Sequence, residues 1–198
     1  MNFISLNSPD QKTPTNAPFL NPQVHADSST FKADISKAEA YAQVLDEARG
    51  LIDGQRNWVC FPPSSFLCWE TGIVDIGGAS KTNMRFYTLD PSSTSSKPSL
   101  ILGPFQGKVA CQTIAFSRGV CGTAASTQTT QLVPDVEKFP GHIACDAASQ
   151  SEIVVPIVVD GVVKAIIDVD CGVKEGFDEV DRKWLEELAG VLAEGCDW

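Results

Sequence analysis

The chain has 198 residues, of which 43% are hydrophobic and 20% charged, so it can bury the core of one domain and is neither disordered nor collagen-like. Its formal net charge of -10 repels nucleic-acid phosphates and anionic lipid, which argues against both as partners. No apolar stretch approaches the roughly 20 residues that cross a membrane, and the N-terminus does not have the pattern of a secretory signal. We therefore expect a cytoplasmic protein.

The N-terminal part of the chain changes character near residue 34. Residues 1–33 are rich in proline and polar residues and show no hydrophobic period, which is typical of a disordered arm. A helix is expected next, because Ser36 and Glu39 form a Ser-x-x-Glu capping box ahead of apolar residues at helical spacing. Residues 61–84 contain several prolines and glycines and show neither a helical nor a strand period. One domain is thus predicted over residues 34–198.

Two hairpins are predicted in the rest of the chain. Residues 85–90 and 100–105 are strand-like and are joined by a long connection. Residues 151–160 and 162–170 form the second hairpin, which turns at an Asp-Gly pair.

Between the hairpins, the sequence predicts a partly extended segment at 109–116, a short helix within 117–127 and an ordered loop at 131–150. An amphipathic helix capped by Asp178 follows the second hairpin. Strands without regular β-α alternation, together with two terminal helices, predict an α+β fold. Its sheet is expected to be antiparallel, with the N- and C-terminal helices packed on one face.

The chain has seven cysteines. In the reducing compartment that we expect, cysteines stay reduced unless they are catalytic, redox-sensing or metal-bound, so they are the first candidates for reactive residues. Cys145 lies in a loop of small residues three positions after His142, which favours a reachable thiolate, although a small buried side chain is the alternative. Cys111 and Cys121 could converge on this loop as a redox or metal site. We expect no metal, because the chain has no closely spaced Cys or His pair.

Three acidic residues belong to the second hairpin. Asp168 and Asp170 are two positions apart on one strand, so they share a face, and Glu152 opens the partner strand. That face is either exposed to solvent or lines a polar pocket. In a pocket, the three carboxylates could hold an ammonium group, and crowding would raise the pKa of at least one of them. A thiol beside such an acid suits a reduction in which a thiolate attacks sulfur and a second thiol closes a disulfide.

Several motifs, in order along the chain, resemble the free methionine-(R)-sulfoxide reductases, enzymes built on a GAF domain. These motifs are LILGPFQGKVAC, RGVCGTAA, QLVPDV, FPGHIACDAASQSEIVVPI and IDVDCG. The resemblance begins near Ala33, lapses after Val59 and resumes at Phe86. It implies a GAF-like fold and the reduction of free L-methionine-(R)-sulfoxide to L-methionine.

The resemblance also implies roles for individual residues. Cys145 matches the catalytic cysteine, which becomes a sulfenic acid, Cys111 the resolving cysteine that forms a disulfide with it, and Cys121 an auxiliary cysteine. The residues matching the acidic pocket that recognises the amino acid and assists proton delivery are Glu152, Asp168 and Asp170. Thioredoxin would act as the external reductant, no cofactor would be needed, and a homodimer is suggested.

One segment departs from the family pattern. Where members have a helix resembling N-L-A-N-x-x-S-L-L-W-H and a strand beginning W-A-G-F-Y, this chain has the divergent residues 61–84 and then Arg85-Phe86-Tyr87. Tyr87 matches the motif's tyrosine, expected at the thioether end of the substrate, whereas the tryptophan has no counterpart and Arg85 replaces the glycine. A non-catalytic GAF binding module and an inactive isoform are therefore the alternatives to an enzyme.

Overall fold

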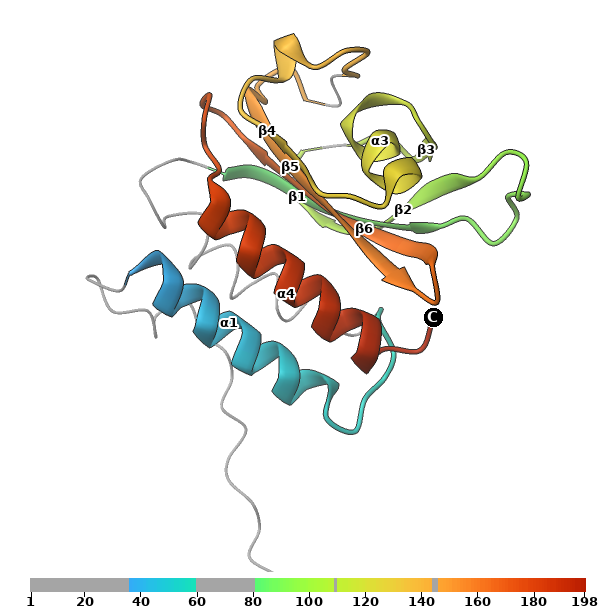
Figure 1. The fold of residues 1–198 in the computed structure, drawn as a ribbon, viewed down its shortest axis with the longest axis vertical. Coiled ribbons are helices and arrows are strands. Elements are labelled where there is room, and N and C mark those ends of the chain that lie inside the picture. The colour runs from blue at the N-terminus through green and yellow to red at the C-terminus, as the bar shows by residue number, and fades with distance from the viewer. Residues whose placement is uncertain (1–35, 60–80, 109, 144–145) are drawn as a thin grey trace, which may run out of the picture.

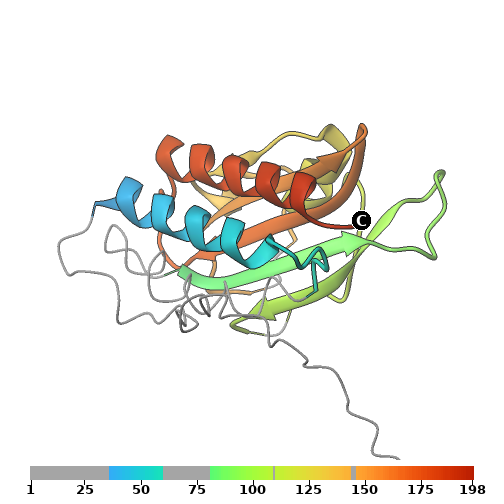
Figure 2. The same cartoon turned by 90° about the horizontal axis from the view of Figure 1, so that it is seen from below.

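The computed structural model describes residues 36–59, 81–108, 110–143 and 146–198. Within these ranges, six strands form one sheet in the order β3-β2-β1-β6-β5-β4, and every neighbouring pair is antiparallel. Helices cover both faces of this sheet (Figures 1 and 2). The predicted α+β class and antiparallel sheet are confirmed. The expected arm at 1–33 and the start of the domain at 34 lie outside the described residues.

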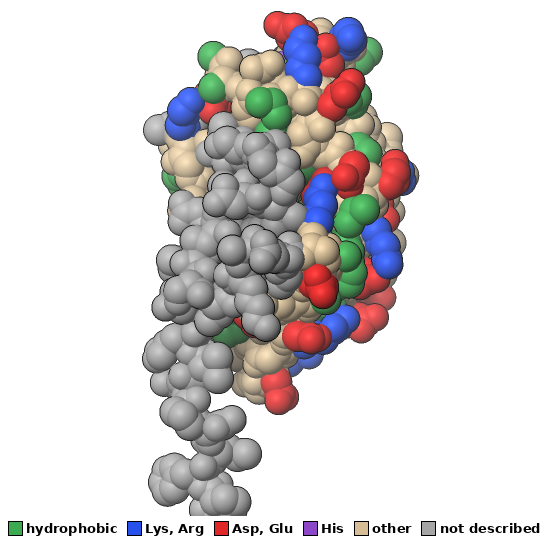
Figure 3. Space-filling view, turned by 90° about the vertical axis from the view of Figure 1, so that its left-hand side faces the viewer, with side chains coloured by type: hydrophobic (Ala, Val, Ile, Leu, Met, Phe, Trp, Pro, Cys, Tyr) green, Lys and Arg blue, Asp and Glu red, His purple; other side chains and the backbone are tan. Residues whose placement is uncertain are grey.

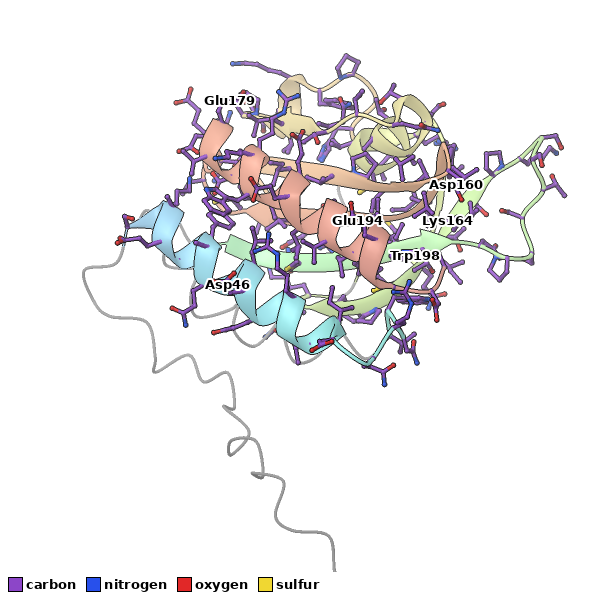
Figure 4. The ribbon with its side chains drawn as sticks, turned by 60° about the horizontal axis from the view of Figure 1, so that its bottom comes forward. Asp46, Asp160, Lys164, Glu179, Glu194 and Trp198 are labelled. Carbon is purple, nitrogen blue, oxygen red and sulfur yellow. The ribbon has the colours of Figure 1, made fainter. Side chains whose placement is uncertain are left out.

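The sheet is built from strands of unequal length. Its strands are β1 (Lys81–Leu89), β2 (Ser99–Gln106), β3 (Thr113–Ala115), β4 (Gln131–Val133), β5 (Ser151–Val159) and β6 (Val162–Cys171). The helices are α1 (Lys37–Ile52), α3 (Gly119–Thr127), the 3-10 turn η2 (Val136–Lys138) and α4 (Glu179–Gly195). Both predicted hairpins are present, and Asp160 and Gly161 turn the second one with φ of 52° and 73°, as an Asp-Gly turn requires. Figure 4 shows Asp160 at this turn.

One predicted strand is longer than expected, and another strand lies where the sequence predicts none. β1 contains most of the predicted strand at 85–90 but begins inside residues 61–84, whereas β4 lies inside the predicted loop at 131–150. Each of them pairs with a long strand of the second hairpin, β1 with β6 and β4 with β5. These backbone partners are distant in sequence, so the local pattern does not encode them.

The two faces of the sheet carry different helices. On one face, α1 and α4 pack side by side over alternate strand residues such as Phe86, Ile153 and Ile167. On the other face, α3 packs over Tyr87 and Ile166. The terminal helices therefore share one face, as predicted, and α3 covers the opposite one.

Buried polar contacts at their N-terminal ends join α1 to α4. Asp178 caps α4, and Ser36 and Glu39 form the expected capping box of α1. Asp181, which is fully buried, accepts hydrogen bonds from the Tyr41 hydroxyl at 2.7 Å and the Lys37 ammonium at 2.5 Å. One carboxylate thus ties the two helices together.

Among the described ranges, no helix is long and apolar enough to cross a membrane. Acidic and basic side chains are interspersed over the described part of the face in Figure 3.

Candidate active site

A cavity of about 340 Å³ lies on the α3 face of the sheet. The strands β1, β5 and β6 supply Arg85 and the three acids, the β3–α3 segment supplies Arg118 and Cys121, and the loop before β5 supplies His142 and Asp146. The volume falls within the range of small-molecule sites. The residues that matter for its chemistry are Arg85, Cys111, Cys121, Glu152, Asp168 and Asp170.

The strand registers bring the three predicted acids together. Glu152 on β5 lies opposite Asp170 on β6, and Asp168 follows on the same face of β6. All three side chains are buried. The alternative of a solvent-exposed acidic face is therefore wrong, and the carboxylates line a pocket as the sequence also allowed.

Arg85 joins this acidic cluster from the neighbouring strand. It lies opposite Asp168 in the β1–β6 register, and its Nη1 forms ion pairs with Asp168, at 3.2 Å, and with Asp170. Only 2% of Arg85 is exposed. The sequence marked Arg85 as a replacement for a glycine but did not place it in the pocket. A charged residue between apolar neighbours on a strand was the available signal, because such a residue needs a buried partner.

Burial and mutual repulsion shift the protonation of the acids. Desolvation, followed by the charge of Asp170, raises the pKa of Asp168 to about 7, although Arg85 opposes this shift. Desolvation and the charges of Asp168 and Asp170 raise the pKa of Glu152 well above its usual value. At neutral pH, the cluster therefore holds a protonated carboxyl that can donate a proton.

Two of the three predicted cysteines line the cavity. Cys121 lies at the start of α3, where the thiol donates a hydrogen bond to Glu152 Oε1 at 3.6 Å. Burial and the neighbouring acids raise the pKa of this thiol, so Cys121 stays protonated. Next to it, a Cβ on Gly122 would collide with the Ala115 carbonyl oxygen, which explains why a glycine lets α3 approach β3 so closely. Cys111 is half-buried and disulfide-bonded.

The third cysteine, Cys145, lies outside the described residues. The described residues on either side of that gap, Ile143 and Asp146, both line the cavity. Asp146 is held by the side chain of Asn83 at 2.9 Å and by the backbone of Ala148, and these bonds lower its pKa to about 2. The segment is thus anchored to β1 directly beside the gap.

Comparisons with known proteins agree with this arrangement. The family model of the GAF domain matches residues 70–195. The free methionine-R-sulfoxide reductase of Saccharomyces cerevisiae is 50% identical over 177 residues, which cover 87% of this chain and 94% of that protein. The chain belongs to the GAF-domain family of free methionine-R-sulfoxide reductases.

Solved structures of the family superpose on the chain over most of its length. A structure described as that of the GAF domain matches with a TM-score of 0.80 and 47% identity, covering 88% of this chain and 97% of the other. The free methionine-R-sulfoxide reductase of Neisseria meningitidis, solved in complex with its substrate, matches with a TM-score of 0.73 and 35% identity, covering 86% and 95%. The expected GAF-like fold is confirmed.

Tyr87 packs behind the cavity on the α3 face. Its side chain is fully buried in the core beneath α3, and it is not among the described residues that line the cavity. Within the described part of the chain, its hydroxyl has no hydrogen-bond partner. The contact of Tyr87 with a substrate, which the family motif implies, stays a prediction.

His142 is a cavity residue that the sequence noted only as a neighbour of Cys145. Its Nε2 lies 3.9 Å from Glu152 Oε2, and its side chain is 17% exposed. A protonated His142 would favour the ionised form of Glu152, whereas a neutral one would leave it protonated.

Among the described residues, one group has ligand atoms close enough together to bind a metal ion. Cys121 Sγ and the carboxylates of Glu152 and Asp168 lie within 4.8 Å of one another. The guanidinium of Arg85 already supplies a positive charge to Asp168. The absence of a metal from the reaction remains a prediction from the sequence.

The buried acids predict how stability depends on pH. Because the pKa of Asp168 is raised in the folded chain, the folded state binds more protons than the unfolded state between about pH 4 and 7. The free energy of unfolding contributed by Asp168 should therefore fall as pH rises through this range, by up to about 1.4 kcal/mol per pH unit. We expect Asp168→Asn to flatten this slope in urea unfolding at a series of pH values.

Asp160 provides the control for that measurement, because it is an exposed carboxylate on the same hairpin. Asp160→Asn should retain the slope of the parent chain. A slope that Asp168→Asn leaves unchanged would mean that Asp168 is ionised throughout the range.

Proposed function

We propose that the chain reduces free L-methionine-(R)-sulfoxide to L-methionine with its own cysteines. The observation that carries this proposal is one cavity that combines two cysteines with a buried, protonated carboxyl, in a member of this reductase family. The yeast relative is named for the same activity, and the Neisseria relative was solved with its substrate bound.

In the proposed reaction, the thiolate of Cys145 attacks the sulfoxide sulfur. Glu152 or Asp168 protonates the sulfoxide oxygen. That oxygen then forms a bond to the Cys145 sulfur while its bond to the substrate sulfur and the bond between the two sulfurs break, so methionine leaves and Cys145 becomes a sulfenic acid. The Cys111 thiol then attacks the sulfenic sulfur and releases water, leaving a disulfide between the two cysteines. One sulfoxide and two thiols thus give one methionine, one disulfide and one water.

Two features of the described residues support this sequence of steps. Cys111 is disulfide-bonded, whereas Cys121, Cys171 and Cys196 form no disulfide, so its partner is not one of these three. The raised pKa of Glu152 keeps a proton available beside the cavity at neutral pH. We further propose that thioredoxin reduces the disulfide by exchange and that the chain acts as a homodimer in the cytoplasm.

The test is turnover of the reduced protein with four substrates, namely the (R) and (S) epimers of methionine sulfoxide, each free and within a peptide. We expect turnover of the free (R) epimer with thioredoxin as reductant and at least about 100-fold lower kcat/KM for the other three. Binding of the free (R) epimer without turnover would favour the alternative of a non-catalytic binding module. Equal rates for both epimers would contradict the proposed reaction.

A further inference from the structure

Arg85 occupies the acidic cluster that a substrate's ammonium group would need. Its Nη1 already makes ion pairs with Asp168 and Asp170, and the whole residue is buried in the cavity floor. Building on the proposed function, we infer that Arg85 competes with the ammonium group of the free amino acid for these two carboxylates. The chain would then select only weakly for a substrate that carries a free ammonium.

Arg85 already places a positive charge on the carboxylates that an ammonium group would use. An ammonium group has three donors and no acceptor, so it needs the oxygens of the acidic cluster. In this chain, both ion pairs of Arg85 use the Oδ2 atoms of Asp168 and Asp170. A second cation must therefore either displace the guanidinium or lie beside a like charge in a buried site, and both weaken its binding.

Two hydrogen-bond donors of the Arg85 guanidinium are not paired with any described residue. Within the described residues, its Nε and Nη2 are buried without a partner, and so is Oδ1 of Asp168. Neighbouring Nε and Nη2 donors of an arginine are spaced to bind one carboxylate with two parallel hydrogen bonds. These two nitrogens have almost no accessible surface, so a ligand carboxylate reaches them when the Arg85 side chain, which lines the cavity, shifts toward it.

This arrangement favours a ligand that has a carboxylate and no ammonium group. A carboxylate satisfies the unpaired donors of Arg85, whereas an ammonium on the adjacent carbon adds an unfavourable charge next to the guanidinium. The hydroxy acid analogue of methionine sulfoxide, with a hydroxyl in place of the ammonium, keeps the first interaction and avoids the second. The preference between these two compounds therefore reports what Arg85 does.

The experiment measures the dissociation constants of both compounds, as (R)-sulfoxides, by calorimetry in a Cys145→Ser background that prevents turnover. With Arg85 present, we expect the hydroxy acid to bind at least as tightly as the amino acid. Arg85→Gly, which restores the glycine of the family motif, should shift the preference toward the amino acid by about tenfold or more.

A second variant guards against misfolding, and a matched variant controls for the loss of an arginine. Arg85→Gln also removes the charge but retains volume and polarity, so it decides the result if Arg85→Gly does not fold. Arg182 also pairs with two carboxylates, Glu179 and Glu186, but at the exposed surface of α4. Arg182→Gln should leave the preference within about twofold of the parent.

Several outcomes would overturn the inference. A parent that binds the amino acid tenfold more tightly than the hydroxy acid would do so, as would an unchanged preference in both Arg85 variants. If the wild-type chain turns over the free (R) epimer and neither Arg85 substitution shifts the preference between the two compounds, the inference is wrong and the proposed function stands. Conversely, if the Arg85 substitutions shift the preference but the wild-type chain has no turnover, the inference stands and the proposed function is wrong.

Discussion

Cys145→Ser is expected to lower the rate of methionine-(R)-sulfoxide reduction by at least about 1000-fold, even in a single turnover. A serine hydroxyl stays protonated at neutral pH and is a far weaker nucleophile than a thiolate. The measurement mixes pre-reduced protein in excess with the sulfoxide and follows methionine formation by rapid quench. Excess protein removes recycling from the readout, so only the first attack on sulfur is observed.

Cys111→Ser is expected to behave differently, because Cys111 is proposed to act after methionine has left. This variant should form one methionine per active site at nearly the parent rate and then stop, with Cys145 trapped as a sulfenic acid. Cys196→Ser is the control, since Cys196 is buried next to the end of α4 and does not line the cavity. If Cys111→Ser lost the first turnover as completely as Cys145→Ser, the assignment of nucleophile and resolver would be wrong.

Asp181→Ala is expected to reduce the free energy of unfolding by about 3 kcal/mol. The change removes a fully buried carboxylate and leaves the Tyr41 hydroxyl and the Lys37 ammonium without their acceptor. It also removes the acceptor for the backbone N–H of Asp178 in the capping box. Urea unfolding, followed by circular dichroism and by the fluorescence of Trp184, which stacks on Tyr41, would measure the loss.

Asp46→Ala is the matched control on α1. Asp46 pairs with Arg49 on the exposed surface of the helix, and Figure 4 shows its position there. An exposed pair of this kind contributes little, so the variant should unfold at nearly the urea concentration of the parent. Equal losses for Asp46→Ala and Asp181→Ala would show that the buried carboxylate does not hold the two helices together.

Sequence reasoning predicted the parts of the site that depend on local periodicity. Asp168 and Asp170 were placed on one face because a strand repeats every two residues, and Glu152 was placed on the partner strand of the same hairpin. The β-bulge between Ile157 and Val158, which the sequence did not predict, shifts the register so that Glu152 lies opposite Asp170. The same reasoning found the capping residues Ser36 and Asp178. These features need only a few neighbouring residues to be specified.

The features that sequence reasoning missed depend on contacts between distant segments. Arg85 reaches the acidic pocket because β1 pairs with β6 in a register that sets it opposite Asp168. Nothing in residues 81–89 alone specifies that register. The burial of Tyr87 likewise depends on α3, which packs over it from a distant part of the chain.

The separation of the two faces of the sheet has a consequence for engineering the protein. The cavity with its crowded acids lies on the α3 face, whereas the Asp181 anchor and the aromatic stack of Trp58, Phe86 and Trp198 lie on the other. Because successive strand residues point to opposite faces, substitutions on one side leave the other largely intact. We therefore expect thermostabilising changes between α1 and α4 to provide a background that tolerates redesign of the cavity.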